Sequence, residues 1–438
     1  MKNNLKFKKW FEPFEATFRD LVNKNRDLSG AKNPFPMSMT IRGSDAVYDS
    51  HGVYEIETLL RSALNIAPSI DESLIKQIFL HALFSDKLSK KFTLDEFSKL
   101  CRQRYSTSQR RTTKKFVVCS GLFIKQPSAI KRLSYEGHLI TILKNDSPAA
   151  QEFQEARLET ISKFENEFSD DAPLFLKIHI EARDGSGAIH QAFRTAEKIR
   201  GLMNLAENRH LPKTRVIAGK QIYRGLSKFR YSKYFTVHLP NGKIVPNSNF
   251  IYYPEWEKWN RIPHFDEDSR TYKQFEYYLS KSKAKHGLSE EFYKLLELYL
   301  EAIDEKNIRA AFLKLWTLVE NLTAISGSDN HTKVVDRLLK FTTLERHNFA
   351  KMALTNIRLS RNNLVHQGKS EDFSTTQTLI YQLHDYVHFL MRMYLVNDME
   401  FSDLQQFKLF MDLPRDQSIL NDRQSLIEKA IQHRNNYP

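Results

Sequence analysis

The sequence predicts an α+β protein with a mixed N-terminal region and a C-terminal antiparallel α-helical bundle. Short alternating runs such as 174–182 are typical of strands, and they fall before residue 250. Beyond residue 289, apolar residues recur every three or four positions over long stretches with short breaks between them, as in helical bundles. Gly and Pro number only 14 each in 438 residues, which argues against long low-complexity tracts.

We expect four segments along the chain. Residues 1–150 form a mixed α/β region with a basic loop, suited to a recognition or regulatory role, and residues 151–285 form a second α+β segment. The alternative is that these two segments make one domain. Residues 286–400 form the helical bundle and 401–438 a helical tail, with Lys281–Gly287 as the candidate linker.

Local signals place the N-terminal elements. Ser69–Glu72 and Thr93–Glu96 have the spacing of capping boxes, so each opens a helix. Asp184–Gly187 reads as a turn before a helix over 191–206. Apolar runs predict strands at 116–119, 122–124, 138–143 and 174–182, and a hairpin over 235–245 around Pro240-Asn241-Gly242.

Helical periodicity places the C-terminal elements. It predicts helices over 289–304, 306–325, 333–341 and 344–367. Ser374–Gln377 has capping-box spacing and should open the last long helix, and a further helix is expected over 425–433.

Composition narrows the classes of partner. A formal charge of +14 and a pI near 9.4 favour a polyanion, although a merely solvated basic surface is the alternative. Two cysteines, Cys101 and Cys119, exclude a disulfide framework and a four-thiolate zinc site, so we expect no cofactor and no metal. No apolar stretch is long enough for a membrane span and Met1–Phe18 lacks a signal-peptide core, so we expect a cytoplasmic protein.

Two runs contain many cations and no acid, at 102–115 and 213–233. The first suits contact with a nucleic acid backbone, including duplex DNA in one reading. The second mixes cations with aromatic rings, as single-stranded nucleic acid surfaces do. In both, the alternative is an irregular segment with exposed cations and buried rings. The candidate substrate-binding residues are Arg110, Arg111, Lys114, Arg224 and Arg230.

The stretch Ile357–Gly368 carries the most specific pattern. Arg361 falls on the apolar stripe of its helix, where a guanidinium needs an anionic partner or ligand. Asn362 and His366 lie four residues apart and therefore share a face. Gly368 is placed to end the helix in the left-handed conformation.

Arg361, four intervening residues and His366 resemble the Arg-x4-6-His motif of HEPN ribonucleases. A polar residue directly after the arginine, here Asn362, is also typical of that family. The upstream segment 315–322 resembles the first long helix of its ApeA-like branch, where an acidic residue such as Glu320 often lies near the pair. The resemblance covers about the last third of the chain.

The resemblance implies a metal-independent endoribonuclease that acts in phage defence or as a toxin and leaves 2',3'-cyclic phosphate ends. His366 suits movement of the 2'-hydroxyl proton, and Arg361 suits stabilisation of the charged phosphorane. Asn362 would orient the imidazole or bind a phosphate oxygen, and Glu320 would hold Arg361 or polarise His366. Arg358 would extend the cationic face as a further substrate-binding residue. The implied partners are RNA (tRNA or mRNA), a second copy of the chain, and a phage-derived trigger or inhibitor.

Two alternatives stay open for this region. The Glu320 and Arg361 side chains would also suit a buried ion pair that only fixes the bundle, with His366 as a helix cap. The family also suggests a non-catalytic HEPN module that binds RNA or dimerises within a larger assembly.

Overall fold

A computed structural model describes most of the chain from residue 93 onwards. The described residues are 78–79, 82, 93–110, 112–125, 132–163, 165, 171–210, 225–245, 251–253, 263–323, 331–343, 345–369 and 371–436. The helix expected after Ser69–Glu72 begins outside them. The chain divides into two compact units that interleave in sequence: Met1–Leu122, Ala129–Arg194 and Tyr231–Trp256 form the first, and the remainder forms the second.

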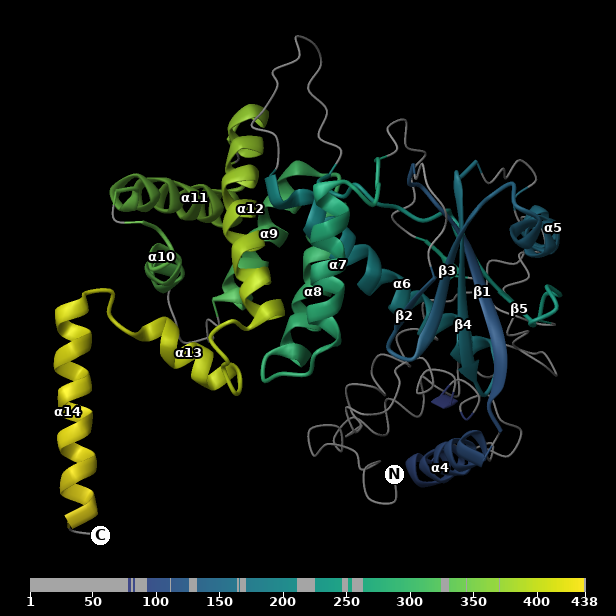
Figure 1. Ribbon diagram of the computed structural model, residues 1–438, viewed down its shortest axis with the longest axis horizontal. Helices are drawn as coiled ribbons and strands as arrows, with labels where there is room; N and C mark the ends of the chain where they lie inside the picture. Colours follow the sequence, from purple (N-terminus) through teal and green to yellow (C-terminus); the bar gives the residue numbers. More distant parts are fainter. Residues whose placement is uncertain are drawn as a thin grey trace. The chain divides into compact units, whose positions relative to one another are not determined.

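A six-stranded antiparallel sheet organises the described part of the first unit (Figure 1), with strand order β2-β3-β4-β1-β5-β6. Its long central pair is fixed by a nine-residue register that runs from Lys114 opposite Ala182 to Leu122 opposite Leu174. The strands are β1 (Lys114–Leu122), β2 (Arg132–Tyr135), β3 (His138–Lys144), β4 (Leu174–Ala182), β5 (Tyr234–His238) and β6 (Ile251–Tyr252).

Helices cover both faces of this sheet. Helix α5 (Pro148–Ser162) packs Phe153 and Ala150 against Cys119 and Phe175 on one face. The N-terminal part of α6 (Gly185–Glu207) packs Phe193 on Phe235, which lies on the opposite face because side chains alternate along β5. Helix α4 (Leu94–Arg110) precedes β1, and Thr93 caps its start, because the Thr93 Oγ1 accepts the Glu96 N–H as the capping box predicts.

The described part of the second unit consists mainly of helices, with α12 in contact with α7, α8 and α9. Leu379, Leu383, Val387 and Leu390 form a continuous buried stripe along α12. The helices are α7 (Arg270–Lys283), α8 (Ser289–Asp304), α9 (Ile308–Leu322), α10 (His331–Leu339), α11 (His347–Gln367), α12 (Phe373–Val396), α13 (Leu404–Asp412) and α14 (Gln417–Asn436), preceded by the short 3-10 helix η2 (Asn208–His210) and the end of α6.

The α+β class is confirmed and the expected C-terminal helices are present, but several local details differ. The runs expected as strands at 116–119 and 122–124 belong to the single strand β1, which ends at Leu122, so residues 123–124 lie outside any strand. Asp184–Gly187 is not a turn, because Asp184 Oδ1 accepts the Gly187 N–H 2.8 Å away and α6 begins at Gly185. Asp372, not Ser374, caps α12 by accepting the Thr375 N–H. The Lys281–Gly287 stretch forms the end of α7 and a tight connection to α8 within the second unit, so no unit boundary falls there.

Candidate functional site

Helix α11 carries the candidate motif and is fixed along one face. Ala350, Leu354, Ile357 and Ser360 are buried, and the helix ends at Gln367. Gly368 follows with φ +63°, and its N–H donates to the carbonyl oxygen of Asn363. The left-handed cap predicted from the sequence is therefore confirmed.

Arg361 continues the buried face of α11 and meets α9. Its Nη2 lies 3.9 Å from Oε1 of Glu320, and both side chains are largely shielded from solvent. The same carboxylate oxygen accepts a hydrogen bond from Trp316 Nε1 at 2.6 Å. Nε of Arg361 is buried and has no hydrogen-bond partner among the described residues. The sequence-based expectation of an anionic partner for Arg361 is thus met by a long, single-contact ion pair.

Asn362 joins this group, whereas His366 does not. Arg361 Nη1 donates to Asn362 Oδ1 at 3.3 Å. His366 is exposed in the last turn of α11 and makes no hydrogen bond or ion pair within the described part of the chain. Five residues of α-helix separate the Arg361 and His366 side chains by about 140° around the axis. One copy of the chain therefore gathers Glu320, Arg361 and Asn362, and leaves the imidazole on another side of the helix.

Arg358 lies one turn before Arg361 but is turned toward α10. Its Nη1 donates to Oγ1 of Thr332 at 2.8 Å. Its buried Nε has no partner among the residues that the structure describes. Arg358 was expected to extend the cationic face beside Arg361, but its guanidinium is already bonded to the neighbouring helix α10.

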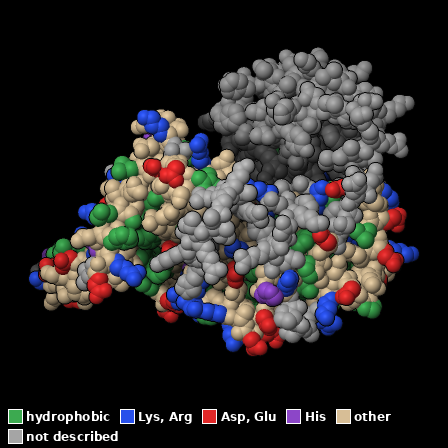
Figure 2. All heavy atoms as spheres, turned by 90° about the horizontal axis from the view of Figure 1, so that it is seen from above, with side chains coloured by type: hydrophobic (Ala, Val, Ile, Leu, Met, Phe, Trp, Pro, Cys, Tyr) green, Lys and Arg blue, Asp and Glu red, His purple; other side chains and the backbone are tan. Residues whose placement is uncertain are grey.

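The first basic run forms the end of α4 and the start of β1. Arg110 and Lys114 are exposed there, and Arg111 lies outside the described residues. The loop expected between helix and strand is only three residues long, 111–113. On the face drawn in Figure 2, basic and acidic side chains are interspersed across the described surface and do not gather into one patch.

The second basic run does not form the expected surface where it is described. Arg230, expected to bind substrate, is only 1% exposed, so its guanidinium does not lie on the surface where a substrate would meet it. Phe229 and Tyr231 are buried as well, which leaves neither ring free to stack on a base. Arg224 lies outside the described residues. In the described part of the run the aromatic rings are buried, as the alternative expects. That alternative also expects exposed cations, and Arg230 differs because it is buried.

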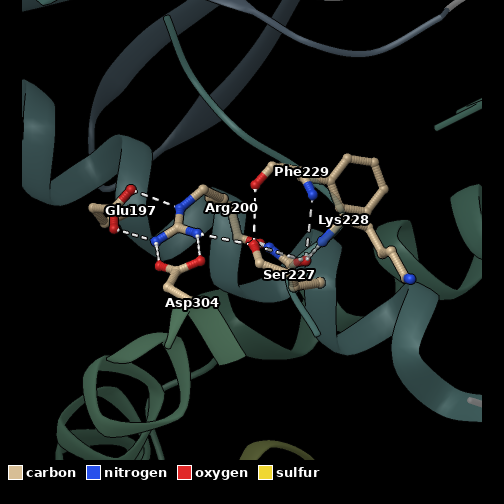
Figure 3. Close-up of polar contacts among 7 residues, drawn as sticks. Glu197, Arg200, Ser227, Lys228, Phe229 and Asp304 are labelled. Carbon is tan, nitrogen blue, oxygen red and sulfur yellow. Dashed lines mark hydrogen bonds and ion pairs between the residues drawn. The ribbon is translucent and has the colours of Figure 1, made fainter. Parts of the chain in front are cut away.

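A buried polar network explains why this segment runs through the interior. Arg200 on α6 pairs with Glu197 and bidentately with Asp304 at the end of α8, and its Nη1 also donates to Ser227 (Figure 3). Asn204 Oδ1 accepts the Lys228 N–H at 2.7 Å. These bonds hold a non-helical segment inside the second unit through the Ser227 side chain and the Lys228 backbone.

Other chemistries have little support among the described residues. No group of three His, Cys, Asp or Glu side chains in the described ranges is arranged to hold a metal ion. Burial raises the pKa of the Cys119 thiol to about 12 and also raises the pKa of Cys101, so neither supplies a thiolate near neutral pH. No helix in the described ranges has the length and apolar character to cross a membrane.

Known proteins add no further assignment to this geometry. Comparisons of the chain with protein-family models, with curated proteins and with solved structures find no match.

Proposed function

We propose that this chain is a metal-independent endoribonuclease of the HEPN type, with Arg361 and His366 at its active site. The observation that carries the proposal is that the Arg361 guanidinium is only loosely paired. Its guanidinium is held near Glu320 at 3.9 Å and keeps a buried Nε without a partner in the described ranges, on the helix that ends with the exposed His366. A cation so loosely paired can exchange the carboxylate for a phosphate oxygen.

The proposed reaction follows from these groups. The 2'-oxygen of one nucleotide attacks the adjacent phosphorus while its proton passes to a base, and the 5'-oxygen of the next nucleotide leaves with a proton from an acid. The products are a 2',3'-cyclic phosphate and a 5'-hydroxyl. The His366 imidazole suits one of the two proton transfers, and the Arg361 guanidinium stabilises the doubly charged phosphorane. Asn362, bonded to Arg361, positions it for this role.

The wide angle between Arg361 and His366 favours a site shared by two copies. The α11 face that carries His366 also exposes a row of apolar residues: Phe349 is 71% exposed and Met352 73%, followed by Leu359. Such residues at three- and seven-residue spacing suit contact with another helix. We propose that two copies meet through this face, so that each active site draws groups from both. The substrate is RNA, and the setting is phage defence or toxin action in the cytoplasm.

One observation favours the alternative of a non-catalytic HEPN module. The hydrogen bond of Trp316 to Glu320 and the shielding of Arg361 are what a structural ion pair in a helical bundle would need. In that alternative, the α11 face would serve only to dimerise or to bind RNA.

The decisive test measures cleavage and binding together. Wild type, Arg361→Ala and His366→Ala are expressed in cells and, once purified, incubated with total tRNA in EDTA. We expect growth arrest and cyclic-phosphate ends from wild type but not from Arg361→Ala or His366→Ala. The control Lys351→Ala, which removes an exposed cation on the same helix, should be as active as wild type. If His366→Ala arrests growth as wild type does, the catalytic proposal is wrong. Binding of tRNA by wild type without cleavage or toxicity would favour the alternative.

A further inference from the structure

Helix α14 is an exposed helix with an apolar face. Every residue from Asn421 to Asn435 is exposed, although the helix is 20 residues long. Leu426 is 67% exposed and Ile427 59%, and Ile419 and Ile431 are also exposed. Helices in proteins owe most of their stability to the burial of one face. An exposed apolar face of this length therefore indicates a partner.

The residues just before α14 are bonded to α10 and to the turn that follows it, so the start of α14 is fixed to the second unit. Arg337 on α10 is buried and bonds bidentately to Asp412 at the end of α13. Lys340 donates to the carbonyl oxygens of Met411 and Leu413, and Arg415 donates to that of Thr342. Beyond this anchor, α14 stands apart from α10, α11 and α13 in Figure 1.

The spacing of α14 is that of a helix that pairs with another helix. One stripe, which we call the α14 seam, has residues four, three and four positions apart: Ile419, Arg423, Leu426 and Ala430. This is the spacing of a two-stranded coiled coil. Leu420 and Ile427 flank the seam on one side, and Asp422 and Lys429 flank it on the other.

The charges beside the α14 seam indicate that two α14 helices pair antiparallel, and they identify α14 of a second copy as the partner. Asp422 and Lys429 lie one heptad apart on the same flank, with opposite signs. In a parallel in-register pair of two α14 helices, Arg423 would face Arg423 of the other copy across the seam and Lys429 would lie beside Arg434, so like charges would repel. In an antiparallel pair Asp422 of one copy faces Lys429 of the other, twice, about one two-fold axis. The same register sets Ile419 against Ala430 and Arg423 against Leu426, and it brings Leu420 beside Ile427.

We propose that α14 is a self-complementary dimerisation helix that pairs antiparallel with α14 of a second copy. The aliphatic part of Arg423 packs on Leu426 of the other copy while its guanidinium reaches solvent. This surface is separate from the α11 face, and the inference does not rest on the proposed nuclease chemistry. It adds a second contact between copies, fixed to the bundle through Arg337 and Asp412.

Site-specific cross-linking of the full chain tests orientation directly. Ile419→Cys and Ala430→Cys chains are prepared separately, mixed and oxidised. We expect a covalent dimer from the mixture and little from either chain alone, because antiparallel pairing brings only these two positions together. The native Cys101 and Cys119 are buried, so they should contribute little cross-linking of their own. Cross-linking of Ile419→Cys with itself would mean parallel pairing, and no cross-link in the mixture would mean that α14 does not pair. Either result overturns the proposal.

Charge reversal gives an independent measurement. Analytical ultracentrifugation of the Met352→Asp chain, in which the α11 face is disrupted, isolates the α14 contact. Adding Asp422→Lys should weaken self-association about tenfold, because two favourable charge pairs become two repulsive ones. Combining Asp422→Lys with Lys429→Asp should restore it. A swap that fails to rescue, or a single reversal without effect, contradicts the predicted register.

Discussion

Trp316 donates its indole N–H to Glu320 one turn further along α9, and this fixes the carboxylate that faces Arg361. The bond is 2.6 Å long, whereas the carboxylate oxygen lies 3.9 Å from the guanidinium. The carboxylate is therefore held more tightly by its own helix than by its cationic neighbour. An anchored acid beside a loosely paired cation is a suitable arrangement for exchange with an anionic ligand.

Glu320→Gln should lower stability only slightly. The change removes the charge that faces Arg361 but keeps an acceptor for the Trp316 N–H, so we expect a loss of about 1 kcal/mol in the free energy of unfolding. Urea unfolding followed by circular dichroism measures it. Glu159→Gln, which removes an exposed helical pair with Lys163, is the matched control and should have almost no effect. A loss equal to that of the control would show that Arg361 does not depend on Glu320.

The buried His384 should make stability depend on pH. Burial, and secondarily the nearby His388, lower the pKa of His384 to about 3, whereas an unfolded chain protonates it near 6.5. Between these values the unfolded state binds more protons, so stability falls as pH falls through that window. The slope from this one group is at most about 1.4 kcal/mol per pH unit.

Replacement of His384 isolates this effect. His384→Gln keeps a neutral polar group near the Tyr299 hydroxyl, which lies 3.3 Å from the imidazole Nε2. We expect lower stability at pH 7 and a shallower decline between pH 6 and 4 than in wild type. Gln367→Ala, at an exposed position without a titratable group, should keep the wild-type slope. Parallel curves for wild type and His384→Gln would contradict the prediction.

Gly287 should tolerate no side chain. A Cβ at this position would lie 1.9 Å from the carbonyl oxygen of Ser402, a backbone atom with little room to move. Gly287→Ala should therefore cost about 3 kcal/mol or more, measured by thermal or urea unfolding. Gly137→Ala is the control: its φ of +80° imposes strain, but nothing lies within 4 Å, so about 1 kcal/mol is expected. Equal losses would mean that the connection between α7 and α8 can shift.

Asp412→Asn should loosen the C-terminal helices. The substitution removes the carboxylate charge that Asp412 holds against the buried Arg337 guanidinium, and because Asp412 is partly exposed we expect a loss of about 2 kcal/mol in the free energy of unfolding. Limited proteolysis should release α13 and α14 earlier than in wild type. Asp398→Asn, which breaks an exposed pair with Arg392, should leave the digestion pattern unchanged. Resistance of Asp412→Asn to proteolysis would assign the anchoring to other contacts.

The elements that the sequence predicted correctly are those whose signals are local. Thr93 and Gly368 mark helix ends through hydrogen bonds within a few residues of chain. Where two local signals competed, the interpretation was wrong: Gly185 and Gly187 suggested a turn, but Asp184 caps a helix that begins among them. Helix α7 was missed because its buried face consists mainly of aromatic rings, which are as common in strands.

The candidate site was predicted only in part, because burial depends on contacts distant in sequence. The pairing of Glu320 with Arg361 followed from the position of Arg361 on the apolar stripe of its helix and from the resemblance, which implies an acidic residue near it. The interior position of Arg230 could not follow from its neighbours in sequence. It depends on Asn204 and Arg200, which hold the segment before it from another helix. The different directions of Arg361 and His366 follow from helical geometry alone and were available in the spacing.

The second unit is discontinuous in sequence, and this restricts how the candidate site can be inherited or dissected. Helix α12 bonds through His388 to the carbonyl oxygen of Leu205, and Asn208 shares the Tyr299 hydroxyl with His384. Both partners lie well upstream of residue 286. A gene fragment that began there would lose them and expose the imidazoles they cover. Recombination should therefore transfer this bundle only together with the strands that interrupt it.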